Sequence, residues 1–480
     1  MFFWQKVFYQ YWHTPHPAAW QRRVFRLLAV GGLAMLLLTP PFFGNDEEDY
    51  LFRAWQLSRG ELLAQHRPGF SGGHIPASWH RAWHNVAKPA QHNFHHHLPA
   101  DSLWHYLQEP LAPHHTRLMD FRNTALYSPV GFLPHLPAMW LGQGLELSAF
   151  GTLYLARLLQ YLLWLWLGWL ALRRLPAGSF AALLLLFLPM SLYQATTLTA
   201  DALNNGLAFL FVATLLRWRA RGDFVGGRRV ATVVGFLLAF ALIKQVYVLL
   251  AGALLLLTAA QCGGRRRQWG VLVGSLALAL GVGALWSGWV LQVYEPMQLA
   301  ATPADHRPAA TLRWILAHPA EYALAVLRGM LHWAGTLWAT GLGVLGKSSV
   351  LLPHRVYVLL SVALGVLWVA DTPPGPPPGY LRRAALLGLF LLGTAAVFLV
   401  ISLTYYGPGD LRFAGVVGRY LLPLLPLLLP ALMPRLPALA GPRTLALFTL
   451  LVAGYALLES LRALVQRYYG VDFLSFSTGG

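Results

Sequence analysis

Long apolar runs recur along the 480-residue chain and are separated by short polar connections. About 20 apolar residues in a row are long enough to cross a bilayer as an α-helix. The pattern predicts about eleven transmembrane helices, near residues 24–43, 149–172, 178–196, 202–216, 230–243, 246–260, 269–293, 355–370, 384–404, 416–433 and 444–460. We therefore expect an all-α, polytopic membrane protein in which residues 1–480 form a single integral membrane domain.

Basic residues gather in every second connection between the predicted helices. With the N-terminus placed in the cytoplasm, the cytoplasmic segments hold 18 Lys and Arg against two acids, Asp223 and Asp371. The spans and the outer segments hold the other 18 basic residues and 16 acids. Because short basic connections mark the cytoplasmic side, this asymmetry predicts the orientation. It also explains the net charge of +18, which would favour nucleic acid in a soluble chain, so we expect no nucleic-acid partner.

Composition excludes two broad classes of protein. Of all residues, 56% are hydrophobic and 11% are charged, whereas a soluble globular chain has roughly 25% charged residues and a disordered chain has low hydrophobicity. The single cysteine, Cys262, excludes an internal disulfide and a cysteine-rich zinc site. The chain has no Asn-x-Ser/Thr sequon and only four lysines, which favours a bacterial inner membrane as the location.

Two segments between the predicted helices are long enough to fold outside the bilayer. The larger, residues 44–148, follows the first span and is expected to be the first outer, periplasmic loop. Its second part, residues 129–147, is apolar but interrupted by prolines. If this part crossed the membrane, Arg173 and Arg174 would lie outside, so we predict juxtamembrane helices along the outer interface. A second outer segment, residues 294–354, is predicted to be partly helical.

Four carboxylates stand immediately after the first span, in the sequence NDEEDYLFRA at residues 45–54. On a helix, Asp46, Tyr50 and Arg53 would share one face through i, i+4, i+7 spacing. Such a group fits a general base at the membrane surface, oriented by a neighbouring cation. The alternative is an ordinary acidic helix start, because carboxylates favour the positive end of a helix.

Three further polar motifs fall at the outer ends of predicted helices. Residues 196–205 contain Asp201, which fits either a site residue or a plain helix N-cap. Lys244 interrupts an apolar stretch, where a charge indicates function by default and could meet a phosphate, although a snorkelling lysine is the alternative. Arg412 and the run Gly418-Arg419-Tyr420 suit bidentate phosphate binding, with an interfacial belt of aromatic and arginine residues as the alternative.

Two other patterns suggest chemistry that their context does not support. Residues 341–348 match the phosphate-binding motif G-x-x-x-x-G-K-S, but a Trp-rich apolar segment precedes them where a P-loop needs a strand. Twelve of the 18 histidines lie between His66 and His135, without the ligand spacing of a metal site. We expect a solvated, pH-sensitive loop there and predict no metal site, and a divalent metal stays open as a cofactor.

The order of these motifs resembles the C-type (GT-C) membrane glycosyltransferases. It resembles more closely a bacterial family of uncharacterised multi-pass membrane proteins grouped with that superfamily. The family motif P-x-D-E-x-x-H-x-x-R-A corresponds to the stretch at residues 45–54, with Tyr50 in place of the histidine and with the proline replaced. The similarity continues through most of the chain, at residues 157–159, 188–190, 199–201, 244–247 and 415–423.

The resemblance implies a GT-C-like fold and the transfer of a sugar from a polyprenyl-phosphate donor to a glycan or glycolipid acceptor at the outer face. The acceptor hydroxyl would attack the anomeric carbon while a carboxylate takes its proton, so inversion is expected. The catalytic candidates, with the expected base first, are Asp46, Glu47 and Asp201. The candidates for binding the donor phosphate are Arg53, Lys244, Arg419 and Tyr420.

Three other functions compete with this interpretation. A transporter or flippase of lipid-linked sugars would also be polytopic, but such proteins often show internal repeats, and none is apparent here. An O-antigen-ligase-like enzyme relies on Arg and a late outer loop, which the acidic first loop argues against. A non-catalytic scaffold predicts that an Asp46→Asn substitution changes nothing except stability.

Overall fold

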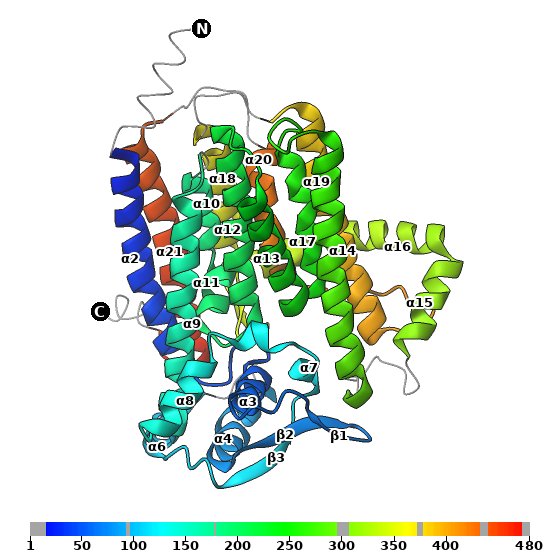
Figure 1. Cartoon of the computed structure of the whole chain (residues 1–480). Coiled ribbons are helices and arrows are strands. Elements are labelled where there is room, and N and C mark those ends of the chain that lie inside the picture. The colour runs from blue at the N-terminus through cyan, green and yellow to red at the C-terminus, as the bar shows by residue number, and fades with distance from the viewer. Residues whose placement is uncertain are drawn as a thin grey trace.

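The apolar runs fold into long helices that lie side by side in one bundle (Figure 1). The structure is a computed structural model that describes residues 16–92, 97–176, 179–294, 307–371, 378–432 and 440–472. The long helices are α2 (His16–Leu38), α9 (Ala149–Leu172), α12 (Ala200–Arg221), α13 (Gly227–Ile243), α14 (Arg265–Val290), α18 (His354–Ala370), α19 (Tyr380–Tyr405) and α21 (Pro442–Tyr469). Helix α9 has the predicted bounds, and α12, α19 and α21 extend beyond theirs because polar residues continue each helix past its apolar stretch.

Several predicted spans are broken or tightened into other helix types. These elements are α10 (Ser179–Leu186), α11 (Pro189–Thr196), η3 (Gln245–Leu256), η4 (Leu291–Val293), η5 (Gly418–Leu427) and α20 (Leu428–Leu432), of which η3, η4 and η5 are 3-10 helices. Leu188 is extended because it precedes Pro189, and α10 and α11 therefore meet at a bend of 55°. Pro423 and Pro426 lie inside η5 and remove two backbone donors, which disfavours a regular α-helix there.

Four helical segments in the described ranges are long and apolar enough to cross a membrane: α9, residues 265–293, α19 and α21. The bent pair α10 and α11 would make a fifth span. The prediction of about eleven spans is therefore matched only in part by helix length and composition. The difference arises because several apolar stretches form shorter helices, of which η3, α18 and the segment Gly418–Leu432 are examples.

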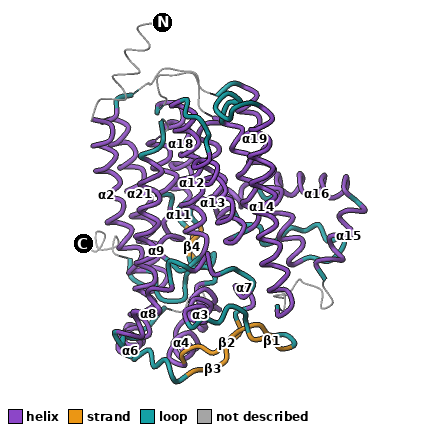
Figure 2. The backbone as a smooth tube through the Cα atoms, viewed as in Figure 1, coloured by secondary structure: helices purple, strands orange, loops and turns teal. Residues whose placement is uncertain are grey.

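A layer of short helices and strands covers one end of the bundle, which we call the sheet end (Figure 2). Its helices are α3 (Glu47–Ser58), α4 (Ala77–Ala82), the π-helix η1 (Trp83–Ala87), α5 (Lys88–His92), α6 (Ala100–Gln108), α7 (Arg122–Ala125), the 3-10 helix η2 (Pro129–Phe132) and α8 (Leu136–Gly144). The apolar stretch predicted to form juxtamembrane helices thus folds as η2 and α8. Its strands β1 (Gln65–Arg67), β2 (Phe70–Pro76) and β3 (Thr116–Asp120) form an antiparallel sheet in the order β1-β2-β3.

This sheet was not predicted from the sequence, and its turn chemistry shows how it forms. Arg67 pairs with Phe70 across a two-residue turn that contains Gly69 at φ 71°. Glycine adopts this left-handed conformation without steric cost. Gly72 lies so close to β3 that an added Cβ would stand 1.9 Å from the Met119 carbonyl oxygen, so no side chain fits there.

The described part of the predicted segment 294–354 consists of α15 (Pro308–Ala317), α16 (Pro319–His332), α17 (Ala334–Leu342) and the antiparallel pair β4 (Val344–Leu345) and β5 (Val350–Leu351). Helices α15 and α16 project from the side of the bundle, whereas α17 packs against η5 within it (Figure 1). The prediction of partial helicity is confirmed for residues 307–354, and residues 295–306 lie outside the described residues.

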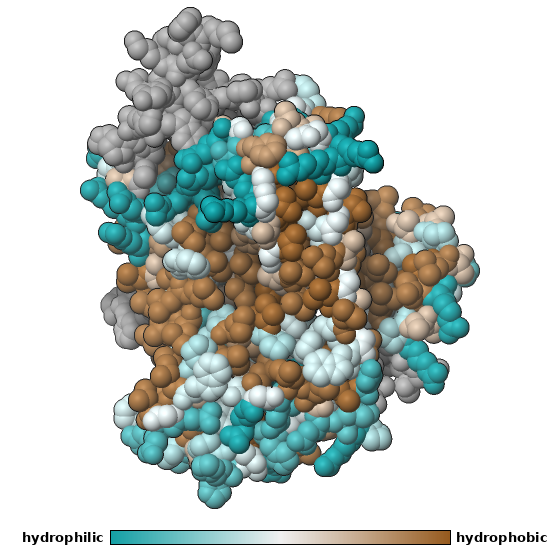
Figure 3. Space-filling view, viewed as in Figure 1, coloured by the Kyte–Doolittle hydropathy of each residue, from teal (hydrophilic) through white to brown (hydrophobic). Residues whose placement is uncertain are grey.

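The opposite end of the bundle gathers the arginine-rich connections, and we call it the arginine end. Arg217 lies within electrostatic range of Arg173, Arg174 and Arg221, and Arg219 within range of Arg382. Between the two ends, the visible face of the molecule carries a broad apolar band over the helices (Figure 3). An apolar band between two polar ends is the surface that a bilayer covers. The basic connections that the sequence assigns to one side therefore do lie together.

Candidate active site

A polar cavity of about 360 Å³ lies where the helix bundle meets the sheet end. Its wall includes five of the residues that the sequence singles out: Asp46, Asp201, Lys244, Arg419 and Tyr420. They come from four separate parts of the chain that the fold brings to one place. We therefore treat this cavity as the candidate active site.

Asp46 occupies a strained position at the start of α3. It is the N-cap residue and has left-handed backbone angles, φ 56° and ψ 26°. A non-glycine residue in this conformation costs about 1–2 kcal/mol, although aspartate tolerates it better than most. The side chain makes no capping hydrogen bond and is 44% exposed. Strain of this kind is typical of functional positions, and it leaves the Asp46 carboxylate available to the cavity.

Lys244 and Asp201 form an ion pair in the same cavity. Lys244 is extended, φ −150° and ψ 105°, because α13 ends before it and η3 begins after it. Its Nζ lies 2.5 Å from Asp201 Oδ1. The Thr199 hydroxyl caps α12 by accepting a hydrogen bond from Asp201 N, and Gln194 Nε2 donates to Asp201 Oδ2 at 3.3 Å. Asp201 is therefore not the N-cap but a first-turn residue whose carboxylate is held on the lysine.

Arg419 is the second residue of η5 and faces Asp46. Its Nη1 donates to Asn45 Oδ1 at 2.7 Å, and its Nη2 lies 3.8 Å from Asp46 Oδ2. The guanidinium also lies over the Tyr420 ring, 5.1 Å from the centroid. Tyr247 fixes this segment by donating its hydroxyl to the Tyr420 carbonyl at 2.7 Å. The cavity thus holds two cations and two carboxylates, in which an entering anion could replace a carboxylate as the partner of a cation.

Tyrosines dominate the rest of the cavity wall. Six line it: Tyr50, Tyr127, Tyr247, Tyr294, Tyr405 and Tyr420. Lys244 Nζ lies 5.7 Å from the Tyr127 ring centroid and 5.4 Å from that of Tyr420. A tyrosine offers an apolar ring and a polar hydroxyl, which together suit the faces and edges of a sugar. Sequence reasoning named Tyr420 as a phosphate-binding residue and Tyr50 as a neighbour of Asp46 on a predicted helix. The signal for the other four tyrosines was their position at predicted helix ends.

Glu47 lies outside the cavity and is fully buried. Its carboxylate accepts from Arg157 Nε at 2.7 Å and Nη2 at 2.6 Å. It also accepts from the backbone N–H groups of Gly44 and Leu198, at 3.1 and 2.9 Å. All of its acceptor capacity is engaged, so Glu47 ties α3 to α9 and to the start of α12. Removing one partner of such a pair costs about 3–5 kcal/mol.

Arg53 also lies outside the cavity. Its guanidinium donates to Gln56 Oε1 and, at 2.8 Å, to the Leu62 carbonyl. The sequence placed Asp46, Tyr50 and Arg53 on one helical face, but α3 begins at Glu47. Asp46 therefore precedes the helix, and the predicted shared face does not form.

The remaining carboxylates of the acidic run pack against a hairpin. Glu48 accepts from Lys347 Nζ at 2.6 and 2.7 Å. Burial raises the pKa of Glu48, and Lys347 opposes the shift. Burial also raises the pKa of Asp49 well above its usual value, with Glu48 and Asp46 adding to the shift. The acidic run therefore divides into residues with separate environments.

Lys347 and Ser348 stand at the tip of the hairpin between β4 and β5, both with left-handed φ, 54° and 67°. A P-loop needs a strand before the glycine-rich loop and a helix that starts at its Lys-Ser. Here α17 precedes the hairpin and β5 follows Ser348. Residues 341–348 therefore match the P-loop in sequence but do not fold as one.

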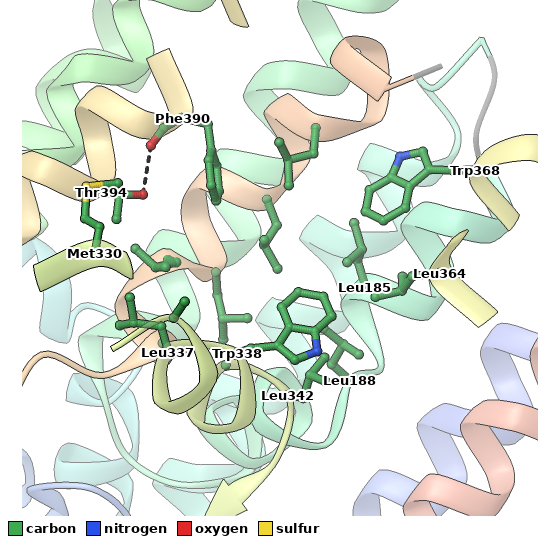
Figure 4. A pocket seen from close by; sticks show the side chains of 17 residues that line it. Leu185, Leu188, Met330, Leu337, Trp338, Leu342, Leu364, Trp368, Phe390 and Thr394 are labelled. Carbon is green, nitrogen blue, oxygen red and sulfur yellow. Dashed lines mark hydrogen bonds between the residues drawn. The ribbon is translucent and has the colours of Figure 1, made fainter. Parts of the chain in front are cut away.

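A second cavity, of about 290 Å³, lies among α10, α16, α17, α18, α19 and η5. Its lining is almost entirely apolar, with Trp338, Trp368 and Phe390 among leucines (Figure 4). Segment η5 contributes to both cavities: Gly418 and Leu421 face the apolar one, and Arg419 and Tyr420 face the polar one. An anionic group and an apolar chain could therefore be bound on either side of one short helix.

Among the described residues, no group of three or more His, Cys, Asp and Glu side chains could hold a metal ion. His95 and His96 of the histidine-rich segment lie outside the described residues, as do residues 1–15 with the predicted cytoplasmic N-terminus. His80 and His84 stack one helical turn apart, with ring centroids separated by 5.8 Å.

Comparison with known proteins places the chain in a family. Residues 29–428 match the family model described as "Predicted membrane protein (DUF2142)", so the chain belongs to that family and is a membrane protein. No curated protein and no solved structure matches the chain.

Proposed function

We propose that this member of the DUF2142 family is a membrane glycosyltransferase that moves a sugar from a polyprenyl-phosphate donor to an acceptor hydroxyl. One observation carries the proposal. The polar cavity holds an exposed, strained carboxylate, Asp46, 3.8 Å from Arg419 and beside the Lys244–Asp201 pair. A proton acceptor next to phosphate-binding cations is what this transfer requires.

In the proposed reaction, the acceptor oxygen attacks the anomeric carbon of the donor. The new carbon–oxygen bond forms as the bond to the phosphate oxygen breaks, and Asp46 takes the hydroxyl proton. Direct displacement inverts the anomeric carbon. The leaving phosphate is a weak base and needs no general acid, so Lys244 and Arg419 suffice to stabilise its charge.

The other candidates act by positioning. Asp201 holds Lys244 Nζ at 2.5 Å, and a donor phosphate would share or replace that contact. Tyr420 supports both cations through its ring. Glu47 and Arg53 hold α3 in place from outside the cavity, so their loss would displace Asp46 without removing a reacting group.

The apolar cavity and the surface of the molecule support a lipid-linked donor. The cavity lies on the other side of η5 from Arg419, where the polyprenyl chain could extend while its phosphate stays on the cations. We propose a GT-C-like topology of about eleven spans in a bacterial inner membrane, with the arginine end in the cytoplasm and the sheet end in the periplasm. Glycans or glycolipids and the surrounding lipids would then be the partners.

Donor turnover tests the proposal. The purified protein in nanodiscs is assayed for hydrolysis of, and transfer from, a panel of polyprenyl-phosphate sugars. We expect Asp46→Asn to lower turnover by about 10²–10⁴-fold, the contribution of a general base. Glu61→Gln is the matched control, because Glu61 is exposed, close in sequence and outside the cavity. Equal turnover in Asp46→Asn and wild type would refute the base assignment.

A transporter or flippase of lipid-linked sugars is the alternative, and the same preparation distinguishes it. If no donor on the panel is turned over, the protein is reconstituted into liposomes and movement of a labelled lipid-linked sugar across the bilayer is measured. Movement without turnover would favour transport and overturn the enzyme proposal.

A further inference from the structure

A basic face lies on the sheet end, outside the candidate active site. We call it the histidine–arginine face and define it by the side chains of His80, Arg81, His84, Lys88, His114, His115 and Arg117. All of these are exposed except His80, which is half-buried. None of them lines the polar cavity, and the proposed reaction uses none of them.

Neighbouring elements of the sheet end bring these side chains together. Strand β2 leads directly into α4, which η1 and α5 continue, and β3 runs beside β2 with Arg117 paired to Ile75. Ala77 N at the start of α4 donates to the His115 carbonyl at 2.8 Å. His80 and His84 then follow one helical turn apart, with stacked rings. The face is therefore built on packed elements and not on a loose loop.

The face is positively charged even where one acid balances it. Arg81 Nε donates to Glu109 Oε1 at 3.0 Å, which pairs one cation. Partial burial lowers the pKa of His80, and Arg117, His84, Arg81 and Lys88 each lower it further. Three cationic groups from β3, α4 and α5, namely Arg117, Arg81 and Lys88, thus act on one point, and such a field attracts anions.

The position of the face disfavours lipid headgroups as the source of the anion. Elements α4, β2 and β3 lie beyond α3 at the far tip of the sheet end, away from the apolar band (Figures 1 and 3). Lipid headgroups border that band, so the position of the face favours an anion that comes from the solution on that side.

Aromatic side chains of η1, and of α6 that packs against it, favour a sugar polymer as the anion. Trp104 of α6 is 63% exposed. Tyr106 on the same helix accepts from Asn85 Nδ2 at 2.9 Å, which holds α6 against η1. Trp83 of η1 lies under Lys88, with the ammonium 5.4 Å from the ring centroid. Exposed aromatic rings stack on the apolar faces of sugars while cations bind acidic substituents.

We propose that the histidine–arginine face binds an acidic glycan, one that carries carboxylate or phosphate groups, and presents it to the active site as the acceptor. The acceptor role rests on the proposed glycosyl transfer. Binding itself requires no turnover and can be measured separately.

The histidines of the face should make this binding depend on pH. Histidine gains charge as the pH falls below about 6.5. The lowered pKa of His80 means that it charges at a lower pH than an ordinary histidine, in the field of Arg117, Arg81, Lys88 and His84. A bound polyanion would favour the charged form of each imidazole. Binding should strengthen with acidity while carboxylates of the glycan stay ionised.

The test measures binding of oligogalacturonate to the full-length protein in zwitterionic nanodiscs, at pH 5.5 and 7.5 and at low and high salt. We expect tighter binding at pH 5.5, weakened by salt. The variant K88Q/R117Q should bind about tenfold more weakly, and H80Q/H84Q should lose much of the pH dependence. The matched control R221Q/R228Q removes two exposed charges at the arginine end and should bind like wild type.

Three results would overturn the inference. They are equal affinity in K88Q/R117Q and wild type, equal binding of neutral dextran, and preferential binding to phosphatidylglycerol vesicles over oligogalacturonate. Each variant changes surface side chains, and gel filtration checks that it folds. A protein that binds the glycan but turns over no donor would keep this inference and lose the proposed function, so the two failures are distinguishable.

Discussion

Asp46 combines a strained backbone with a carboxylate that lines the polar cavity. Its φ of 56° is a conformation that glycine adopts freely. Strained backbone positions cluster at functional sites, which agrees with the place of Asp46 in the cavity wall. The backbone conformation of Asp46 should therefore affect stability, whereas its carboxylate should affect activity.

Substitutions at Asp46 should move stability and activity in different ways. Asp46→Gly removes the side chain and suits the left-handed backbone, whereas Asp46→Ala removes it and keeps the strain. We expect both variants to lose turnover, and Asp46→Gly to be more stable than Asp46→Ala by about 1 kcal/mol. Thermal melting in detergent measures the difference, and an Asp46→Ala variant as stable as Asp46→Gly would contradict it.

At this scale the sequence predicts the composition of the site better than its geometry. Asp201, Lys244 and Arg419 are conspicuous because charged residues are costly near a bilayer, and they do meet in one cavity. Glu47 could not be told apart from Asp46 by sequence, because its direction depends on where α3 begins. Its partner Arg157 is 110 positions away and is known only from the fold.

Among the secondary-structure elements, helix α3 carries the acidic run, and its packing gives each carboxylate a different state. Asp49 stands out because burial raises its pKa well above the usual value, with Glu48 and Asp46 adding to the shift. A raised pKa in the folded state means that the fold favours protonated Asp49. Its stabilising contribution is full below the unfolded pKa, about 3.9, and is lost as the pH rises through the folded value.

The variant Asp49→Asn should therefore be more stable than wild type at pH 7.5. The gain should shrink as the pH is lowered toward 4, because the unfolded state then takes up protons as well and less free energy is needed to protonate Asp49 on folding. Melting temperatures across this pH range test the prediction, with Glu61→Gln as the exposed control. A constant difference between variant and wild type at every pH would show that Asp49 does not titrate as described.

The elements themselves were predictable where one physical signal dominates. Long apolar runs fold as helices, and Pro189 breaks one of them where a proline should. Strands β1 to β3 gave no such signal, since they are three to seven residues long and mix histidine, arginine and glycine. Short strands without alternation depend on their neighbours, so only the folded sheet end reveals them.

On the scale of the whole molecule, η5 separates a charged cavity from an apolar one. Each cavity is built from helices that lie far apart in the sequence, and they meet only because α19 and η5 pack together. A ligand with an anionic head and a long apolar tail could use both. The affinity for a lipid-linked donor should therefore depend on the length of its lipid chain.

Filling the apolar cavity should affect long-chain donors selectively. Ala334 lines this cavity from α17 and is itself exposed, so Ala334→Trp adds bulk with little disturbance of the core. We expect the KM for a long polyprenyl donor to rise about tenfold and the turnover of a ten-carbon prenyl analogue to stay unchanged. Leu331→Trp, at an exposed position that does not line the cavity, is the control. An equal effect on both donors would argue against a chain in this cavity.

The ion pair between Glu47 and Arg157 has a consequence for how the protein is made. An arginine inside a membrane helix costs about 2.5–3.5 kcal/mol to insert unless a partner neutralises it. Arg157 belongs to α9. The Leu36 carbonyl lies in the last turn of α2, and Glu47 with the carbonyls of Thr39 and Pro40 follows that helix. Because synthesis runs from the N-terminus, the carboxylate and these carbonyls leave the ribosome before Arg157 does. Helix α9 can then insert into the bilayer next to groups that neutralise Arg157. The order of these residues in the sequence therefore sets the order in which the ion pair can assemble.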